Sequence, residues 1–382
     1  MPKDEDSVGD VPVFGSNGPY TSTSSRNTDI PAIVLGRKGS YGKVNWAPDG
    51  CFASDTTFFV DARLTNTNLR WLYWSLQTLG LDEGSQEAAV PGLNRESVYE
   101  ERLCLPSPKD QTIIANYLDR ETARIDELIA ERERMLALLE EKRAALTSRV
   151  VTRGLDPGAP LKPSGQEWLG EIPAHWGILQ LRFACDSLQI GPFGTQLHAE
   201  EYVDNGVPVI NPAHLKGNRI TPDFGISVDE ETAERLSIHR LAEGDIVFGR
   251  RGELGRCGIV EESQVGWICG TGSLRVRCDR LVLEPSYLAL VFNSTAAAVR
   301  LTLESVGSTM DNLNTEMLGH FRIPLPPLDE QREIVRAVEA DQRKAIALRA
   351  SLQLSITLAK ERRAALISAA VTGQIPVEEM RG

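Results

Sequence analysis

The stretch that decides the fold is LPSPKDQTIIANYLDRETARIDELIAERERMLALLEEKRAALTSRVVTRGL, residues 105–155, because a second copy of it lies near the end of the chain. The second copy is PLPPLDEQREIVRAVEADQRKAIALRASLQLSITLAKERRAALISAAVTGQI, residues 324–375. The two align without a gap at a constant offset of 220 residues, which sets Gln111 on Gln331. A gapless repeat of this length indicates two modules, each followed by the same long element.

Both copies have the start signals and the spacing of a long helix. Ser107-Pro108-Lys109-Asp110 supplies an N-cap residue, a proline at the first helical position and an acid at the third. Apolar residues then recur at seven-residue intervals, as in the seam of a coiled coil. We expect long helices over 105–152 and 324–375, paired through these residues: Leu118, Ile125, Leu128, Leu139, Leu146, Val338, Leu348, Leu352 and Leu366.

Charges that interrupt the seam predict the direction of pairing. Glu121 in the first copy matches Asp341 in the second, and Lys142 matches Arg362. An antiparallel pair brings Glu121 toward Arg362 and Asp341 toward Lys142, whereas a parallel pair in the same register sets acid beside acid. The sequence therefore predicts an antiparallel coiled coil. The alternative is that these charges are only solvated, since surface ion pairs contribute little energy.

The repeat divides the chain into successive segments. A first module is expected over residues 1–104 and a second over 168–323, with the first long helix between them followed by a Pro- and Gly-rich linker, 153–167. Residues 376–382 form a tail. Short strand-like runs alternate with turn residues in both modules. The predicted fold class is α+β, with two mixed α/β domains, each followed by a long helix, and the two helices paired.

Composition limits the class of protein. The chain has 382 residues, enough for two or three domains with sizeable cores, and no apolar run long enough to span a membrane. Its six cysteines form no C-x-x-C pair, and its polar, acidic N-terminus resembles no targeting peptide. We expect a cytoplasmic protein with reduced thiols. The net charge of −12 argues mildly against nucleic-acid binding, although local basic clusters remain.

One such cluster occurs in both modules. GRKGSYGK at residues 36–43 and GRRGELGR at residues 249–256 share the pattern G-R-basic-G-x-x-G-basic. Glycines let a backbone approach a ligand closely, and arginine or lysine contacts phosphates or guanine edges. The alternative is an ordinary hairpin with solvated charges, but its presence in both modules favours DNA contact. The predicted DNA-binding residues are Arg37, Lys38, Ser40, Tyr41, Lys43, Arg250, Arg251 and Arg256.

A second candidate is the loop Gly191-Pro192-Phe193-Gly194-Thr195-Gln196. Gln196 has the side-chain amide that reads adenine, and Phe193 is the large apolar residue beside it. We include both residues among the predicted DNA contacts. The alternative is a turn packed in place by Phe193.

No complete catalytic motif is present. The glycine-rich segment at 36–43 lacks the spacing of a phosphate-binding P-loop, and no H-E-x-x-H or G-x-S-x-G motif occurs. Asn211-Pro212-Ala213-His214 begins like the N-P-P-Y motif of adenine methyltransferases but lacks its second proline and aromatic residue. We therefore expect no catalytic, cofactor-binding or metal-binding residue, and disfavour a nuclease or methyltransferase that acts alone.

These features together resemble the specificity subunit of type I restriction-modification systems. The resemblance is carried by WLGEIPAHW, GRKGSYG, GRRGELG, IPLPPLDEQREIV and the doubled helix end K/R-R-A-A-L-x-S-x-x-V-T, and it runs from about Pro12 to Ile375. It implies a chain without its own catalytic site, whose two target-recognition domains each read one half of a bipartite site on double-stranded DNA. The long helices hold the domains apart and dock methyltransferase subunits.

The resemblance also implies partners and their cofactors. S-adenosylmethionine is expected in the methyltransferase subunits, and ATP and Mg in the restriction subunits, which translocate and cleave DNA in a bacterial or archaeal cytoplasm. One departure concerns the first domain. Only 35 residues precede Gly36, whereas a long approach leads from Gln166 to Gly249. A shortened first domain leaves open a subunit that reads one half-site or acts only as a coiled-coil adaptor.

Overall fold

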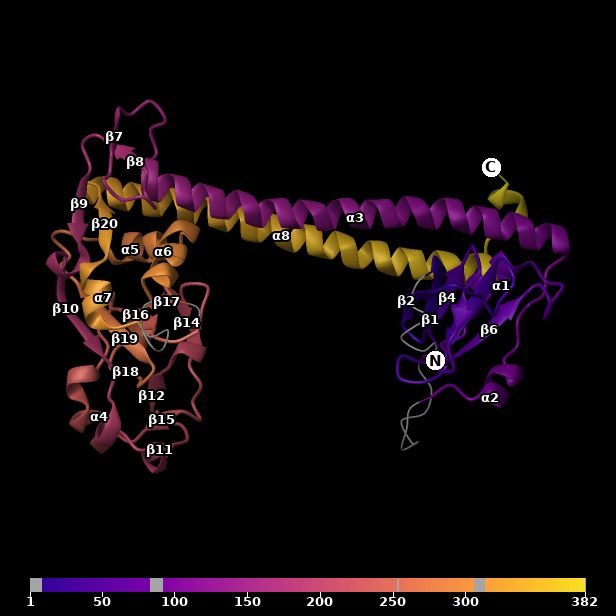
Figure 1. The fold of residues 1–382 in the computed structure, drawn as a ribbon, viewed down its shortest axis with the longest axis horizontal. Coiled ribbons are helices and arrows are strands. Elements are labelled where there is room, and N and C mark those ends of the chain that lie inside the picture. Colours follow the sequence, from indigo (N-terminus) through magenta and orange to yellow (C-terminus); the bar gives the residue numbers. More distant parts are fainter. Residues whose placement is uncertain (1–8, 83–91, 253, 306–312, 382) are drawn as a thin grey trace. The chain divides into compact units, whose positions relative to one another are not determined.

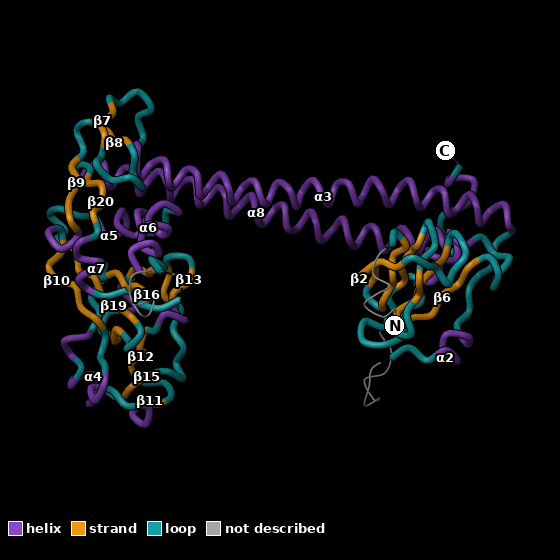
Figure 2. The backbone as a smooth tube through the Cα atoms, viewed as in Figure 1, coloured by secondary structure: helices purple, strands orange, loops and turns teal. Residues whose placement is uncertain are grey.

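The computed structural model describes residues 9–82, 92–252, 254–305 and 313–381. The chain divides into two compact units, with Met1–Met135 and Ser351–Gly382 in unit 1 and Leu136–Ala350 in unit 2 (Figure 1). Each unit combines strands, short helices and a segment of both long helices (Figure 2). Among the described helices, none has the length and apolar character needed to cross a membrane.

Unit 1 contains two three-stranded sheets, the start of the first copy of the repeat and the end of the second copy. Its elements are β1 (Val11–Gly15), β2 (Gly18–Thr23), β3 (Ala32–Gly36), β4 (Val44–Ala47), β5 (Phe52–Ala53), β6 (Thr57–Asp61), α1 (Leu69–Leu76), α2 (Arg95–Glu100), the start of α3 (Pro108–Arg153), the end of α8 (Leu328–Val371) and η8 (Val377–Met380). The sheets have the orders β2-β1-β5 and β4-β3-β6. All of β3 is buried, because Ile33 and Leu35 belong to the core that includes residues of α1, while Ala32 and Val34 belong to the core shared with β1 and β5.

Unit 2 is larger, and its main sheet has the order β10-β19-β16-β17. A second sheet has the order β11-β15-β12-β18, and β20 pairs with β9. The elements are the end of α3, β7 (Leu161–Pro163), β8 (Glu171–Pro173), β9 (Gly177–Gln180), η2 (Leu181–Phe183), β10 (Cys185–Ile190), η3 (Gly194–Gln196), η4 (Ala199–Glu201), β11 (Tyr202–Val203), β12 (Val207–Ile210), η5 (Pro212–His214), β13 (Leu215–Lys216), β14 (Arg219–Ile220), β15 (Ser227–Val228), α4 (Glu230–Arg235), η6 (Ser237–His239), β16 (Ile246–Gly249), β17 (Cys257–Ile259), η7 (Glu262–Gln264), β18 (Ile268–Cys269), β19 (Ser273–Cys278), α5 (Pro285–Phe292), α6 (Thr295–Ser305), α7 (Thr315–His320), β20 (Arg322–Leu325) and the start of α8 (Leu328–Val371).

Unit 1 repeats the later part of unit 2. The antiparallel trio β4-β3-β6 corresponds to β17-β16-β19, since Gly36 pairs with Thr57 as Gly249 pairs with Ser273. The parallel pair β1 and β5 likewise corresponds to β12 and β18. Unit 2 has β8 to β11 before β12, and the described residues before β1 form no counterpart of them.

The two long helices begin and end within four residues of their predicted bounds. α3 spans Pro108–Arg153, where 105–152 was predicted, and α8 spans Leu328–Val371, where 324–375 was predicted. The predicted cap is present, because the Oγ of Ser107 accepts a hydrogen bond from the backbone N–H of Asp110 at 3.2 Å.

The predicted antiparallel pairing of α3 and α8 is confirmed. In unit 1 the Nε of Arg363 lies 2.8 Å from a carboxylate oxygen of Asp126, and the Nζ of Lys360 lies 3.8 Å from Glu133. Residue numbers thus increase along one helix while they decrease along the other. In unit 2, α3 and α8 are also joined by an ion pair, Arg349 with Glu140 at 2.8 Å.

The charged residues that were proposed to direct this pairing do not form the predicted ion pairs between the helices. The carboxylate of Glu121 pairs with Arg120 and Arg124 of its own helix, each at 3.0 Å, rather than with Arg362. The reason is the register, which is set by buried apolar residues and places Asp126 beside Arg363. Surface ion pairs are too weak to override such a seam.

The predicted seam residues occupy three kinds of position. Leu118, Ile125, Val338 and Leu352 are buried, and Leu128, Leu139, Leu146 and Leu366 are half-buried. Leu348 is 50% exposed and lies outside the buried stripe. On α8 that stripe runs from Ala345 through Leu352, Ile356 and Ala359, in steps of seven, four and three residues, so Leu348 falls to one side.

Candidate nucleic-acid interface

The basic hairpin of unit 2 links β16 to β17. The backbone N–H of Gly249 donates to the carbonyl of Arg256 at 2.9 Å, which closes the turn. Gly252 and Gly255 have φ values of +80° and +87°, a region that favours glycine. A side chain at Gly255 would also approach Leu301 of α6 to 3.1 Å. Glycine is therefore required for both the path and the packing of this hairpin.

The loop after β10 lies against the N-terminal end of β19, beside this hairpin. The backbone N–H of Gly191 donates to the carbonyl of Ser273 at 3.0 Å, and a Cβ at Gly191 would lie 1.9 Å from the carbonyl oxygen of Gly270. The Oε1 of Gln196 accepts from the backbone N–H of Phe193 at 3.1 Å. Phe193 is 57% exposed, so the alternative of a turn packed by its ring is wrong.

These two stretches meet at one edge of the main sheet. The C-terminal ends of β10 and β16 and the N-terminal ends of β17 and β19 share that edge, because neighbouring strands in this sheet are antiparallel. The backbone N–H of Arg250 donates to the carbonyl of Gly272 at 2.9 Å, which joins the hairpin to the turn before β19. The structure thus places Arg250, Arg251, Phe193 and Gln196 in neighbouring loops.

The three arginines of this hairpin differ in environment. Arg251 is exposed. Arg250 is half-buried, donates from its Nε to the carbonyl of Leu313 at 3.0 Å, and has a pKa below its ordinary value because of burial and the neighbouring charge of Arg251. The Nε of Arg256 is buried and has no hydrogen-bond partner among the described residues. Arg251 is thus the arginine that presents its charge most directly to solvent.

Equivalent backbone hydrogen bonds hold the hairpin of unit 1. The backbone N–H of Gly36 donates to the carbonyl of Lys43 at 2.9 Å, and that of Arg37 donates to Thr56 at 2.8 Å. The backbone N–H of Leu93 donates to Arg37 at 2.8 Å, as Leu313 does to Arg250 at 2.9 Å in unit 2. The sequence match of the two hairpins therefore reflects the same backbone arrangement.

The side chains predicted to bind DNA in unit 1 lie around this hairpin. Arg37, Lys38, Ser40 and Lys43 are exposed, and Tyr41 is half-buried. The Nζ of Lys43 bonds to the side chain of Asn17 in the turn between β1 and β2.

Sequence reasoning missed Arg95, which belongs to the same surface. The Arg95 guanidinium lies 5.1 Å from the centre of the Phe58 ring, and that of Arg37 lies 5.4 Å from it. These residues, together with Lys38, line a hollow of about 550 Å³. A signal for Arg95 existed, because it follows Leu93-Asn94, the pair that matches Leu313-Asn314 in the repeat.

The segment Asn211-Pro212-Ala213-His214 has a structural role. The Nδ1 of His214 accepts a hydrogen bond from the backbone N–H of Asn211 at 3.1 Å. Burial lowers the pKa of His214 below its ordinary value, so the ring is held neutral as an acceptor. Within the described ranges, no three His, Cys, Asp or Glu side chains are arranged to hold a metal ion.

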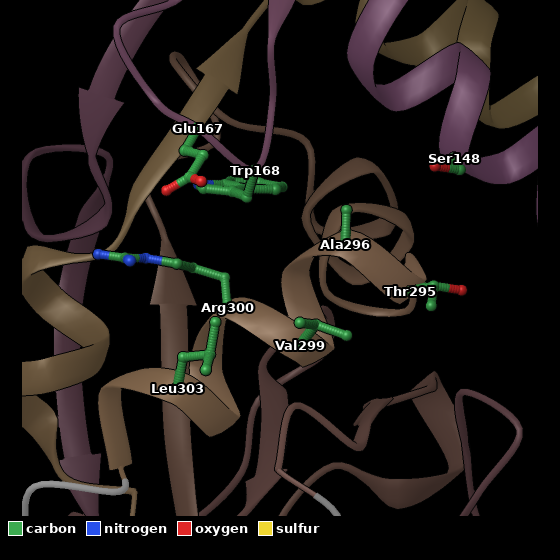
Figure 3. Close-up of a pocket in the computed structure, with 8 residues that line it drawn as sticks. All are labelled: Ser148, Glu167, Trp168, Thr295, Ala296, Val299, Arg300 and Leu303. Carbon is green, nitrogen blue, oxygen red and sulfur yellow. The ribbon is translucent and has the colours of Figure 1, made fainter.

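A further hollow in unit 2, of about 470 Å³, has a different character (Figure 3). Trp168 lies on one side of it, α6 contributes Val299 and Leu303, and Ser148 of α3 lies at its far side. Val299 and Leu303 are both more than half exposed. These apolar walls suit a protein side chain better than a phosphate backbone.

Comparison with protein families places this site in context. Residues 192–358 match the family model described as the type I restriction modification DNA specificity domain. That range contains the basic hairpin of unit 2 and, from residue 192, the loop with Phe193 and Gln196, and it continues into α8.

Curated relatives and solved structures agree. The chain is 21% identical over 313 residues to the EcoBI specificity subunit of Escherichia coli, across 80% of this chain and 66% of that protein. It is 23% identical to the EcoDI specificity subunit of Escherichia coli, across 87% and 76%. The chain thus spans just under two thirds of the length of the EcoBI subunit.

The fold matches solved structures over nearly all of the chain. A structure from a study of assembly of a type I R-M system superposes with a TM-score of 0.69 at 18% identity, covering 96% of this chain and 92% of that one. The HsdS subunit from Thermoanaerobacter tengcongensis superposes with a TM-score of 0.55 at 17% identity, covering 96% and 91%. Together with the internal repeat and the paired helices, these matches show that the chain has the fold of type I restriction-modification specificity subunits and is similar to them in sequence.

Proposed function

We propose that the chain is the non-catalytic DNA-recognition subunit of a type I restriction-modification complex and that its substrate is double-stranded DNA. The observation that carries the proposal is the meeting of two separate loops at one sheet edge in unit 2. Arg251 supplies an exposed cation for phosphate or guanine, and Gln196 supplies an amide for adenine. The exposed ring of Phe193 lies on the loop that also holds Gln196.

We propose further that unit 1 reads a second half-site with Arg37, Lys38 and Arg95. This proposal is supported by the presence of the same hairpin in both units and by the equivalent backbone hydrogen bonds that hold it. A helix over residues 110–149 is about 60 Å long at about 1.5 Å per residue, and one turn of DNA measures about 34–36 Å. Helices of this length have room to set the spacing between two half-sites.

Partner subunits supply the chemistry in this proposal. The paired helices expose apolar residues that suit another helix, such as Leu354 and Leu358, which with Ile125 and Leu128 line a hollow of about 400 Å³ in unit 1. We assign such surfaces to methyltransferase subunits, which bring S-adenosylmethionine. Restriction subunits bring ATP and Mg for translocation and cleavage.

Mapping of adenine methylation tests the proposal directly. DNA from cells that carry this chain with its cognate methyltransferase is compared with DNA from cells that lack only this chain. We expect a bipartite motif that disappears with the chain. Absence of any chain-dependent methylation contradicts the proposal, and DNA modified or cut by the purified chain alone contradicts the non-catalytic assignment.

A second candidate function is a subunit that reads one half-site only. The observation that favours it is that the described part of unit 1 has no counterpart of β10 or of the Phe193 loop. Methylation at a single half-site, or at a palindrome of it, would support this second candidate. Insertion of seven residues at facing positions of α3 and α8 separates the two cases, because only a bipartite target acquires a longer spacer.

A further inference from the structure

The strand β6 of unit 1 lies at the edge of its sheet. Among the described residues, β6 pairs with β3 on one side and has no strand on the other. Its sequence is Thr-Phe-Phe-Val-Asp, which is rich in residues that favour strands and uncharged at its centre. It contains no proline or lysine, which commonly protect an exposed edge from pairing.

Unit 2 shows what normally covers this position. Its equivalent strand, β19, is flanked by β10, and Leu274 and Val276 of β19 are fully buried. The matching residues of β6, Phe58 and Val60, are only half-buried. They line a groove of about 560 Å³ together with apolar residues of α1 and the neighbouring segments, including Leu64, Leu72 and Tyr99. Among the described residues, no strand covers this side of β6, and the groove lies along it.

We propose that β6 of a second copy of this chain occupies the open edge. The two β6 strands pair antiparallel about a two-fold axis at Phe59, which joins the two β4-β3-β6 sheets into one. Such a contact is isologous, because both copies contribute the same strand to it. The dimer goes beyond the proposed function, and its groove shares Phe58 and Arg95 with the basic hollow of unit 1.

The register of unit 2 supports this occupant. There, β10 runs antiparallel to β19 and sets Leu188 opposite Val276 and Ile190 opposite Leu274. Pairing centred on Phe59 sets Phe58 of the second copy opposite Val60, and Val60 of the second copy opposite Phe58. Both incoming side chains therefore lie on the α1 face of the sheet, at the positions that Leu188 and Ile190 occupy along β19.

Sedimentation of the full chain tests whether this dimer forms. We expect the dimer fraction to rise with protein concentration. Phe59→Lys places like charges at the two-fold axis and is expected to weaken self-association at least tenfold. Tyr20→Lys is the matched control, because Tyr20 is an exposed aromatic on β2 of the other sheet of unit 1. This control is expected to leave self-association unchanged.

A cysteine crosslink tests the register and does not depend on the stability of the lysine variant. In a Cys104→Ser background, which removes the exposed native thiol, Phe59→Cys sets two thiols opposite each other at the axis. Glutathione disulfide should then oxidise them to an intermolecular disulfide in Phe59→Cys and not in Tyr20→Cys.

Three results overturn the proposal. The first is a chain that stays monomeric at all concentrations, and the second is a dimer that Phe59→Lys leaves intact. The third is equal crosslinking of both cysteine variants. A monomer that instead binds a peptide with the sequence of residues 183–192 would assign the edge to a strand from a different protein, and would also overturn pairing with a second copy.

Discussion

The side-chain Oε1 of Gln331 accepts a hydrogen bond from the backbone N–H of Glu284 at 2.8 Å. Its Nε2 donates to the carbonyls of Val282 at 3.0 Å and Pro326 at 2.9 Å. Glu284 is the N-cap residue of α5, so one buried amide fastens the start of α8 to the start of α5. This arrangement holds the second domain against the helix that follows it.

The same contact occurs in unit 1. The Oε1 of Gln111 accepts from the backbone N–H of Asn68, the N-cap residue of α1, at 2.9 Å. The Nε2 of Gln111 donates to the carbonyl of Pro106 at 3.0 Å. Gln111 and Gln331, which align in the repeat, therefore make equivalent hydrogen bonds that join each domain to the long helix that follows it.

Replacement of this amide should destabilise unit 2. Gln331→Leu leaves the Glu284 N–H and two carbonyls without their partner in a buried site, which is expected to lower the free energy of unfolding by about 1–3 kcal/mol. Urea unfolding followed by circular dichroism measures the change. Gln353→Leu, at an exposed position of α8, is the control and should change stability little. Equal stability of the two variants would contradict the assigned role.

The two kinds of seam position should differ in their contribution to stability. Leu118 is fully buried beside Trp71 and Ile367, so Leu118→Ala is expected to lower the free energy of unfolding by about 2–5 kcal/mol. Leu348 is half exposed, and Leu348→Ala should lower it by less than about 1 kcal/mol. Thermal and denaturant unfolding compare the two. A larger loss for Leu348→Ala would show that the seven-residue spacing, rather than the observed stripe, describes the interface.

Unit 2 should lose stability in mild acid through His214. Burial lowers the pKa of His214, so the ring stays neutral in the folded state at a pH where it is protonated in the unfolded chain. The unfolded state then binds more protons, and stability falls as the pH drops below the ordinary histidine value of about 6.5.

The variant His214→Asn isolates this effect. Its amide oxygen is able to accept the hydrogen bond from Asn211 and does not titrate. Denaturant unfolding at several pH values should show a smaller loss of stability between pH 7 and pH 5 in the variant than in the native chain. An unchanged pH dependence would mean that other groups cause the loss.

Arg251 should contribute a phosphate contact that depends on salt. Arg251→Ala is expected to weaken binding to DNA that contains the mapped target, and to reduce the slope of log K against log salt by about 0.9. Fluorescence anisotropy at several salt concentrations measures both quantities. Arg280→Ala is the control, because Arg280 follows the opposite end of β19 and bonds to the carbonyl of Glu243. An equal loss in both variants would remove Arg251 from the interface.

Much of the architecture follows from local sequence. The repeat predicted two modules with long helices, and the bounds of these helices agree with the structure because caps and apolar periodicity act within a few residues. The predicted antiparallel direction is also observed, although through ion pairs other than those that were predicted. The hairpins were also found by sequence, since their glycines are required by the backbone path at Gly252 and Gly255. Leu348 and Glu121 differ from the prediction because the final register depends on how two helices pack.

The sequence by itself determined the resemblance to type I specificity subunits, the duplicated plan and the positions of the two basic hairpins. Only the tertiary structure decided that the Phe193 loop and the Arg251 hairpin share one sheet edge, and that Arg95 joins Arg37 around Phe58. It also decided that β6 pairs on one side only within the described part of the chain. The physical reason is that caps, turns and periodicity are interactions between residues close in sequence. Strand order and side-chain neighbours depend instead on contacts between distant segments, which no local pattern specifies.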